Sequence, residues 1–392
     1  MASTSTLTPA LPPTANLKHD FTLARLLCSY VYAAFSALFT KLSSLFCSIG
    51  RSPGPQIPWP KRRVGDTDDY EELYFPLSDT ITIVTGANSG VGYEIAKAHF
   101  RKGSTVILAC RDLERGDNAV RTILQEEGLP ESDVENECLQ VLVCDTSSLE
   151  SVRAFARCFK AVFKGKKIDF LFLNAGICQK PYNIDRFTSE GLEYMYATNF
   201  LGHFLLTGLL SSSFSKDVRI ISTSALAASH ATFDPQLLAR RPNNHEQTLE
   251  VGFHTVKRHP ILARIFSLTP LDVFHIYGQG KAMQIAFSNT LQNRFDQSAR
   301  SKNATNHKFT AAFHPGVVAT NIFKGFYTPD QKHGAQTGLW LAHTFDARPG
   351  AFYDRAKELT LPWYKSYDQQ LADRLWQRWN NDAGLKESDW HF

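Results

Sequence analysis

The sequence predicts an α/β protein with a doubly wound parallel sheet of the Rossmann type, in a single domain preceded by an N-terminal membrane-associated helix. A strand, a glycine-rich turn and a helical pattern follow one another from residue 79. Strands and helical patterns then alternate over about a hundred residues, which is typical of this architecture. The fourth strand, 168–173, is apolar on both faces, as a central parallel strand is.

The composition is that of a folded body, with 43% hydrophobic and 20% charged residues. The formal charge of +4 is small and evenly spread, so we expect no nucleic-acid partner. The seven cysteines are scattered without C-x-x-C spacing, and the histidines form no metal set. We therefore expect a reducing compartment, no disulfide framework and no metal site.

Residues 1–50 differ in kind from the rest of the chain. Residues 1–20 are rich in Ser, Thr and Pro and predict a disordered lead. Within 21–50, an uncharged run at 26–40 places its apolar residues on one helical stripe. The run is short for a spanning helix, which needs about 20 apolar residues. The preferred interpretation is a membrane anchor, spanning or interfacial, with a packed amphipathic helix or a signal peptide as alternatives.

Residues 51–78, with Pro53, Pro55, Pro58 and Pro60 and an acidic patch, predict a linker to a domain that covers 79–392. Basic residues after the anchor outnumber those before it, which places the main domain in the cytosol. The predicted location is a membrane of the endoplasmic reticulum or a lipid droplet.

The glycine-rich turn directly follows the first strand and opens a helix. Its residues are Gly86, Asn88, Ser89, Gly90, Val91 and Gly92. Glycines let the backbone turn tightly and approach a pyrophosphate, whose charge meets the N-terminus of the helix. This order of elements predicts a dinucleotide site.

The residues at two strand ends indicate which nicotinamide cofactor is expected and which further side chains contact it. An acidic residue at the end of the second strand takes the ribose of NAD, but this position holds Cys110 followed by Arg111, which favours NADP(H). The alternative is that Arg111 pairs with a surface carboxylate such as Asp112. The third strand ends on Asp145, which either accepts from an adenine amine or caps the next helix.

A tyrosine and a lysine, Tyr277 and Lys281, lie four residues apart in FHIYGQGK and therefore share a helical face. The ammonium is expected to lower the tyrosine pKa from its reference of about 10 toward the pH at which a general acid works. Such a pair alone is also common on helix surfaces. The two flanking glycines, Gly278 and Gly280, each weaken a helix by about 1 kcal/mol relative to alanine.

Taken together, the motifs resemble the short-chain dehydrogenase/reductase superfamily over roughly 79–355. They occur in the order of that family: Thr85-Gly-x-x-x-Gly90-x-Gly92, Asn174-Ala-Gly176, Tyr277-x-x-x-Lys281 and Pro315-Gly316. Further stretches are similar to its retinol-dehydrogenase-like branch, which also contains broad-specificity carbonyl reductases: 109–112, 199–204, 314–320 and 334–337.

The resemblance implies the roles of individual residues. Those expected to be catalytic are Tyr277, Lys281, Ser224 and Asn199, the last as a member of a proton relay. Those expected to bind the cofactor, besides the glycine turn, are Arg111, Asp145, Asn174, Ala175, Gly176, Tyr277, Lys281, Pro315, Gly316, Val318 and Thr320. Ser222 is the alternative to Ser224. Gly280 departs from the small polar residue that the family usually has before the lysine.

The interval between Ser224 and Tyr277 is long for the superfamily, because residues 229–273 form an inserted loop of mixed apolar and basic content. It either covers the substrate, contacts a membrane or is a surface excursion. A tryptophan-bearing helix around 368–380 is expected to dock on the core, with a substrate lid as the alternative.

These observations predict an NADP(H)-dependent oxidoreductase that interconverts a carbonyl and an alcohol on a lipophilic substrate such as a retinoid, a sterol or another isoprenoid. One alternative keeps this enzyme class with a soluble secondary metabolite or a small carbonyl as substrate. A second alternative is an NADP(H)-binding sensor or scaffold without turnover. The expected partners are the substrate and a membrane surface, and a homodimer stays open.

Overall fold

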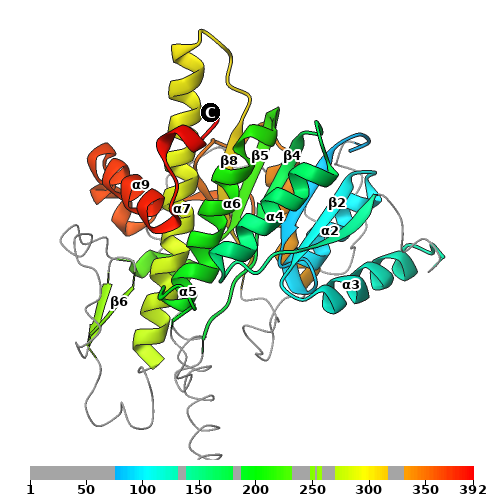
Figure 1. The fold of residues 1–392 in the computed structure, drawn as a ribbon. Helices are drawn as coiled ribbons and strands as arrows, with labels where there is room; N and C mark the ends of the chain where they lie inside the picture. Colours follow the sequence, from blue (N-terminus) through cyan, green and yellow to red (C-terminus); the bar gives the residue numbers. More distant parts are fainter. Residues whose placement is uncertain are drawn as a thin grey trace, which may run out of the picture.

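A computed structural model gives the fold, and it describes residues 76–130, 138–179, 187–231, 248–251, 254–257, 270–316 and 331–392. The predicted lead and the predicted membrane helix lie outside the described residues, as do Val318 and Thr320. No helix in the described part of the chain is long and apolar enough to cross a bilayer. Figure 1 shows a central sheet with helices on both faces.

The sheet has eight strands in the order β10-β9-β8-β5-β4-β1-β2-β3, and all neighbours except β9 and β10 run parallel. The bounds are β1 Ile81–Thr85, β2 Thr105–Cys110, β3 Leu139–Val143, β4 Ile168–Leu173, β5 Phe214–Thr223, β8 Phe309–His314, β9 Phe352–Asp354 and β10 Lys357–Leu359. The chain winds outward from β1 to β3 and returns beside β1 with β4. This reversal between β1 and β4 confirms the predicted doubly wound sheet and creates a crevice at its carboxyl edge.

Each face of the sheet has its own hydrophobic core. One core lies under α2 (Gly90–Arg101), α3 (Leu113–Glu126) and α8 (Gln331–His343). The other lies under α4 (Leu149–Val162), α6 (Gly202–Leu210), α7 (Pro270–Ser301) and α9 (Gln369–Ala383). Alternate residues of β1 explain this division, because Ile81 and Ile83 enter one core and Val84 enters the other.

The long helix α7 carries the FHIYGQGK stretch and begins at Pro270, so the last four residues of the predicted inserted loop are helical. Its first two residues, 229 and 230, end the 3-10 helix η5 (Leu226–His230). Farther along the loop, β6 (Thr248–Val251) and β7 (His254–Lys257) pair as a two-stranded antiparallel sheet.

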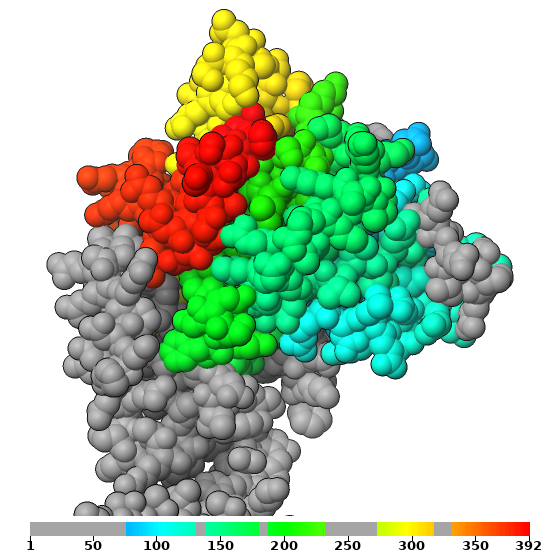
Figure 2. Space-filling view, viewed as in Figure 1, coloured from blue at the N-terminus to red at the C-terminus, as the bar shows by residue number. Residues whose placement is uncertain are grey.

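The C-terminal segment docks on α6 and α7, as predicted for its tryptophan-bearing helix. Figure 2 shows this segment in red against the green and yellow helices. The rings of Trp376 and Trp379 are fully buried, and both contact Phe204 edge-on. The Tyr196 hydroxyl also donates to the Asp382 carboxylate of α9 at 2.9 Å. The segment is therefore part of the core.

Candidate active site

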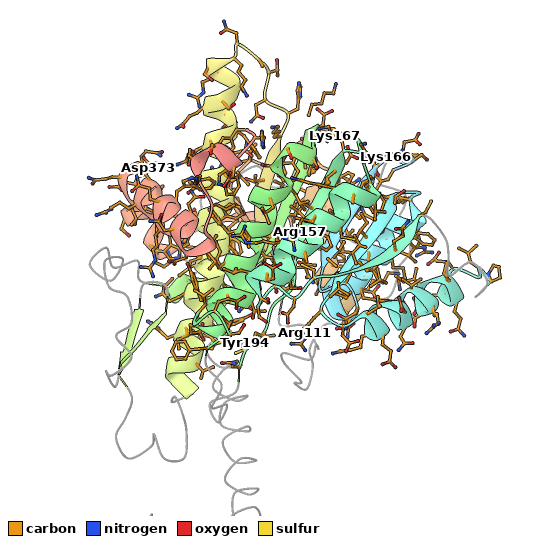
Figure 3. The ribbon with its side chains drawn as sticks, in the orientation of Figure 1. Arg111, Arg157, Lys166, Lys167, Tyr194 and Asp373 are labelled. Atoms are coloured by element: carbon orange, nitrogen blue, oxygen red, sulfur yellow. The ribbon has the colours of Figure 1, made fainter. Side chains whose placement is uncertain are left out.

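A cavity of about 470 Å³ lies at the carboxyl ends of the parallel strands, where open α/β sheets bind ligands. Figure 3 shows the two ends of the sheet, with Arg111 just after β2 at one end and Lys166 and Lys167 just before β4 at the other. The cavity brings together most of the predicted site residues: Gly86, Asn88, Ser89, Gly90, Val91, Arg111, Asp145, Asn174, Ala175, Gly176, Ser224, Tyr277, Lys281, Pro315 and Gly316.

The glycine turn forms a cradle at the N-terminus of α2. Gly86 and Gly90 have φ values of +65° and +69°, a region that side-chain-bearing residues rarely adopt. Gly92 does not line the cavity. A Cβ on Gly92 would lie 2.4 Å from Asn174 Nδ2, so this glycine lets α2 approach the end of β4. The turn therefore fits a pyrophosphate, which glycine backbone and a helix N-terminus accommodate.

The Asn174–Gly176 turn is fastened to the strands on both sides of it. Asn174 Nδ2 donates to the carbonyl oxygen of Thr85 at 3.1 Å, and its Oδ1 accepts from the Thr223 hydroxyl at 3.1 Å. The Thr85 hydroxyl accepts from the backbone N–H of Asn174 and of Ala175. This network fixes the ends of β1, β4 and β5 relative to one another, which gives the cavity a rigid floor.

Lys281 lies at the centre of the site, with its side chain buried. Its Nζ donates to the Thr223 carbonyl at 2.8 Å and lies 5.8 Å from the centre of the Tyr277 ring. Burial lowers the pKa of Lys281 to about 7, so the amine is only partly charged near neutral pH. Burial also raises the pKa of Tyr277, opposite to the expected direction. Desolvation is the largest cause of this rise in the Tyr277 pKa, and the charge of Cys178 acts in the same direction.

Ser224 lies one residue beyond β5, where it lines the cavity, and it donates to the Lys281 carbonyl oxygen at 2.7 Å. The alternative, Ser222, is paired within the fold instead, because its Oγ accepts from the Ser288 hydroxyl at 3.3 Å. Ser222 does not line the cavity. Of the two serines, the geometry gives Ser224 access to a bound molecule.

Asn199 lies in a π-helical turn, η3 (Ala197–Leu201), between α5 (Tyr194–Tyr196) and α6. Its Oδ1 accepts from the Ile177 N–H at 2.7 Å and its Nδ2 donates to the Ile177 carbonyl at 2.8 Å. Asn199 is fully buried and does not line the cavity. In this structure the Asn199 side chain fixes the backbone of Ile177, which follows Gly176. Single π turns such as η3 are frequent at functional sites.

Sequence reasoning did not single out the role of His203, one turn after Asn199. Its two ring nitrogens lie within hydrogen-bond distance of the Asn199 carbonyl, at 3.2 Å, and the Thr85 hydroxyl, at 3.0 Å. Burial lowers the pKa of His203 to about 3, so the ring is neutral at physiological pH. A neutral ring can donate from one nitrogen and accept at the other, as these partners require.

The cofactor end of the cavity carries two arginines. Arg111 makes no ion pair within the part of the chain that the structure describes, so the alternative pairing with Asp112 is not observed. Asp112 instead caps α3 by accepting from the Arg115 N–H at 3.1 Å. Arg115, which sequence reasoning missed, lines the cavity beside Arg111. The available signal was the position of Arg115 in the first turn of α3, at the same end of the sheet as Arg111.

Asp145 also lines the cavity, and it does not cap the following helix. Its Oδ1 accepts from the Ser147 N–H at 2.9 Å and from the Ser147 hydroxyl at 2.7 Å. Ser148 caps α4 by accepting from the Ser151 N–H. The capping interpretation of Asp145 was therefore wrong, because three residues separate it from the first turn of α4.

A family profile described as short chain dehydrogenase matches residues 80–234, which include the glycine turn and Ser224. The chain belongs to the short-chain dehydrogenase/reductase family. As a short-chain dehydrogenase/reductase, the protein is an NAD(P)-dependent oxidoreductase.

Relatives of this short-chain dehydrogenase/reductase include retinol dehydrogenase 12 from Mus musculus, 28% identical over 312 residues, which are 76% of this chain and 84% of that protein. WW domain-containing oxidoreductase from Danio rerio is 28% identical over 81% of this chain and 72% of its own. Among solved structures, an uncharacterized protein from Mycobacterium paratuberculosis superposes with a TM-score of 0.57 at 25% identity, covering 81% of this chain and 97% of that one.

Proposed function

We propose that the protein is an NADP(H)-dependent oxidoreductase that interconverts a carbonyl and an alcohol on a lipophilic substrate. The observation that carries the proposal is one cavity that holds Ser224, Tyr277 and Lys281 beside apolar walls. The walls next to Tyr277 are made by Ile177, Cys178, Leu226, Ala227 and Phe274. Apolar walls around a few convergent polar groups are typical of sites for apolar small molecules.

The preference for NADP(H) over NAD(H) rests on Arg111 and Arg115. A carboxylate at the end of β2 would repel a 2′-phosphate, but Cys110 there is fully buried and uncharged, since burial raises the pKa of its thiol to about 12. Two guanidinium groups at the same end of the cavity suit a phosphate, to which they donate charge-assisted hydrogen bonds.

We assign the chemical roles as follows. When bound, the nicotinamide supplies or accepts the hydride. Tyr277 donates its phenolic proton to the carbonyl oxygen as the alcohol forms, and Ser224 donates a hydrogen bond to the same oxygen. For this the Ser224 hydroxyl rotates away from the Lys281 carbonyl that it contacts. The charged form of Lys281 stabilises the phenolate that remains, and its ammonium holds the nicotinamide ribose.

The lipophilic substrate class gains support from the relatives, since retinol dehydrogenase 12 is 28% identical over 84% of its length. We propose that residues 21–50 attach the enzyme to a membrane of the endoplasmic reticulum or a lipid droplet, with the domain of residues 79–392 in the cytosol. Removing residues 1–50 should then move the protein to the soluble fraction of a cell lysate. An unchanged distribution would place the attachment elsewhere.

A substrate panel tests the proposed activity. Purified protein is mixed with NADPH or NADH and retinal, a 3-ketosteroid, a polyprenal or a small water-soluble aldehyde, and loss of nicotinamide absorbance is recorded. The proposal predicts faster oxidation of NADPH with the apolar carbonyls. Turnover confined to the small aldehyde would favour the soluble-substrate alternative, and tight NADPH binding without any turnover would favour the sensor.

A further inference from the structure

One wall of the cavity is the segment that follows Ser224. Ala225, Leu226 and Ala227 line the cavity, and the last two begin the 3-10 helix η5. On one side this wall lies directly against α7, next to Tyr277. A Cβ added to Gly278 would lie 2.6 Å from the Ala227 carbonyl oxygen, closer than side-chain carbons approach backbone oxygens.

The C-terminal segment contacts the same wall from behind. Trp363 lies in the 3-10 helix η8 (Pro362–Ser366) and is 5% exposed. Its indole Nε1 donates to the Ala228 carbonyl oxygen at 2.8 Å. Neither Trp363 nor Ala228 lines the cavity. The indole therefore acts on the backbone of the wall without touching the contents of the cavity.

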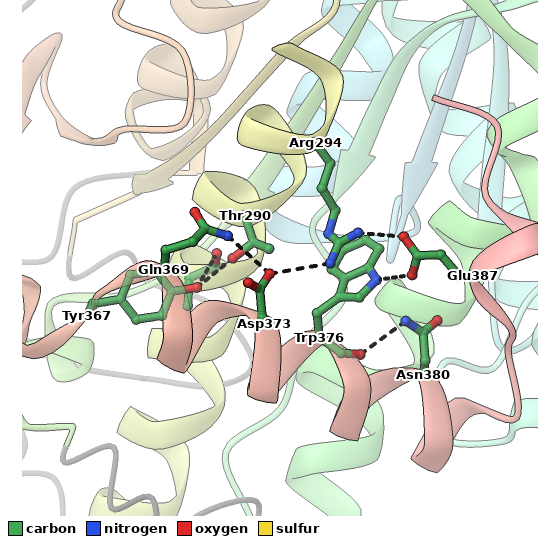
Figure 4. A network of polar contacts seen from close by, with 9 residues as sticks. Thr290, Arg294, Tyr367, Gln369, Asp373, Trp376, Asn380 and Glu387 are labelled. Atoms are coloured by element: carbon green, nitrogen blue, oxygen red, sulfur yellow. Dashed lines mark hydrogen bonds and ion pairs between the residues drawn. The ribbon is translucent and has the colours of Figure 1, made fainter. Parts of the chain in front are cut away.

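The helix η8 is itself fastened to α7, the element that carries Tyr277 and Lys281. The Tyr367 hydroxyl lies 2.5 Å from the Thr290 hydroxyl and donates to the Ala286 carbonyl at 3.1 Å. Figure 4 shows the Tyr367 contact with Thr290, and beside it Arg294 of α7 between Asp373 and Glu387 of the C-terminal segment. The Trp363 ring packs edge-on against Tyr367, with ring centres 5.7 Å apart.

We infer that Trp363 is a positioning residue for the apolar part of the substrate site. Its hydrogen bond to Ala228 and the close packing of Ala227 on Gly278 hold η5 between α7 and η8, and η8 is itself fixed to α7. The distance between the Leu226–Ala227 wall and Tyr277 is thereby set from the C-terminal segment. The inference rests on the proposed function, in which this wall and Tyr277 bind one substrate.

Trp363→Phe tests the inference, because it keeps an aromatic ring in the core while it removes the indole N–H together with part of the ring volume. The matched control is Trp390→Phe in the same segment. Trp390 is 6% exposed, and its Nε1 donates to Asn380 Oδ1 at 2.9 Å. The two substitutions therefore remove equivalent buried hydrogen bonds, but only one of these bonds reaches the wall.

The labelling of one cysteine at the cavity, with two other cysteines as controls, tests the position of the wall without requiring turnover. Cys178 lines the cavity, Cys110 is fully buried and Cys158 is exposed. The purified full-length variants are treated with N-ethylmaleimide, and peptide mapping by mass spectrometry gives the labelling rate of each thiol. Cys110 then measures unfolding, and Cys158 measures the reactivity of the reagent.

Loss of the Trp363 donor is expected to raise the labelling rate of Cys178 by about fivefold, the population change that one net hydrogen bond of about 1 kcal/mol allows. Trp390→Phe should leave this rate within twofold of the parent. The inference is overturned if both variants label Cys178 at the parental rate, if both accelerate it equally, or if Cys110 labelling rises in parallel with Cys178, since the effect would then be global unfolding.

Steady-state kinetics distinguish a failure of the positioning role of Trp363 from a failure of the proposed function. With the carbonyl that the parent reduces best, Trp363→Phe should raise KM about fivefold with kcat and the Kd of NADPH unchanged, because Trp363 does not line the cavity and acts only through the wall. An unchanged KM in an active variant contradicts the positioning role alone. A parent that reduces none of the carbonyls contradicts the proposed function alone, and the Cys178 rates still decide whether Trp363 fixes the wall.

Discussion

The carbonyl oxygen of Ala227 occupies the space that a side chain on Gly278 would need, with only 2.6 Å between this oxygen and a Cβ at position 278. Gly280, two residues on, has no such neighbour. The nearest atoms to a Cβ at position 280 are Asn199 Cβ at 3.8 Å and the Met195 carbonyl oxygen at 3.9 Å, which is ordinary contact. The fold therefore requires a glycine at position 278, next to the tyrosine, but leaves room for a side chain at position 280, next to the lysine.

This difference predicts opposite effects of two alanine substitutions. Gly280→Ala should stabilise the protein by up to about 1 kcal/mol, the gain in helix propensity. Gly278→Ala should destabilise it by about 1–3 kcal/mol, because the added methyl forces the wall away from α7 and overpacking exceeds the propensity gain. Denaturant unfolding of the two variants and the parent provides the measurement. Equal effects of the two substitutions would contradict the close packing of Ala227 on α7.

Cofactor preference provides a second prediction. Arg111→Ala should weaken NADPH binding by about tenfold to a hundredfold, the range for a charge-assisted hydrogen bond, and should leave NADH binding unchanged. Arg115→Ala should act in the same direction. The matched control is Arg157→Ala, which removes an exposed arginine that pairs with Glu150. Titration calorimetry gives the dissociation constants, and a parent with equal affinity for both nucleotides would refute the assignment.

Lys281 predicts a dependence of stability on pH. Its pKa is about 7 in the folded protein, against an ordinary value of 10.5. Between these values the unfolded chain binds more protons than the folded one, so stability rises as pH increases from about 7 to 10.5. Below pH 7 both states are protonated and the full cost of burying the charge applies.

The matched measurement compares the parent with Lys281→Met without added nucleotide. Across this window, the difference in unfolding free energy between the two should change by up to about 1.4 kcal/mol per pH unit, in the sense that the parent gains as pH rises. Parallel curves for the two proteins would mean that the lysine titrates normally in the folded state.

Local sequence patterns predicted those parts of the site that lie within one turn or one strand end. The glycine turn and Asn174 occur at the cavity because parallel strands bring their carboxyl ends to one edge, and the Tyr277–Lys281 pair reaches it because both side chains share one face of α7. Asn199 was assigned to the site by resemblance and Gly92 by its place in the glycine-rich turn, yet both lie behind the cavity surface, where they fix Ile177 and the approach of α2. A linear motif does not distinguish lining a cavity from supporting its wall.

Contacts between residues far apart in the chain could not be predicted from the sequence. The contact of Trp363 with Ala228 joins positions 135 residues apart, and no periodicity relates them. The pKa of Tyr277 shows the same limit, since the local pair with Lys281 predicts a lowered value and burial by the whole fold raises it. Patterns predicted which groups meet, and the packing around them decides their ionisation.

The proton donor is the central element of the proposed chemistry, and Tyr277→Phe tests it most directly. The tyrosine ring lies against the lysine and the apolar wall, so phenylalanine preserves the packing and removes only the hydroxyl. With NADPH and the best carbonyl of the panel, turnover should fall by at least about a hundredfold, the contribution of a general acid, with the Kd of NADPH unchanged. Turnover at the parental rate in this variant would contradict the account.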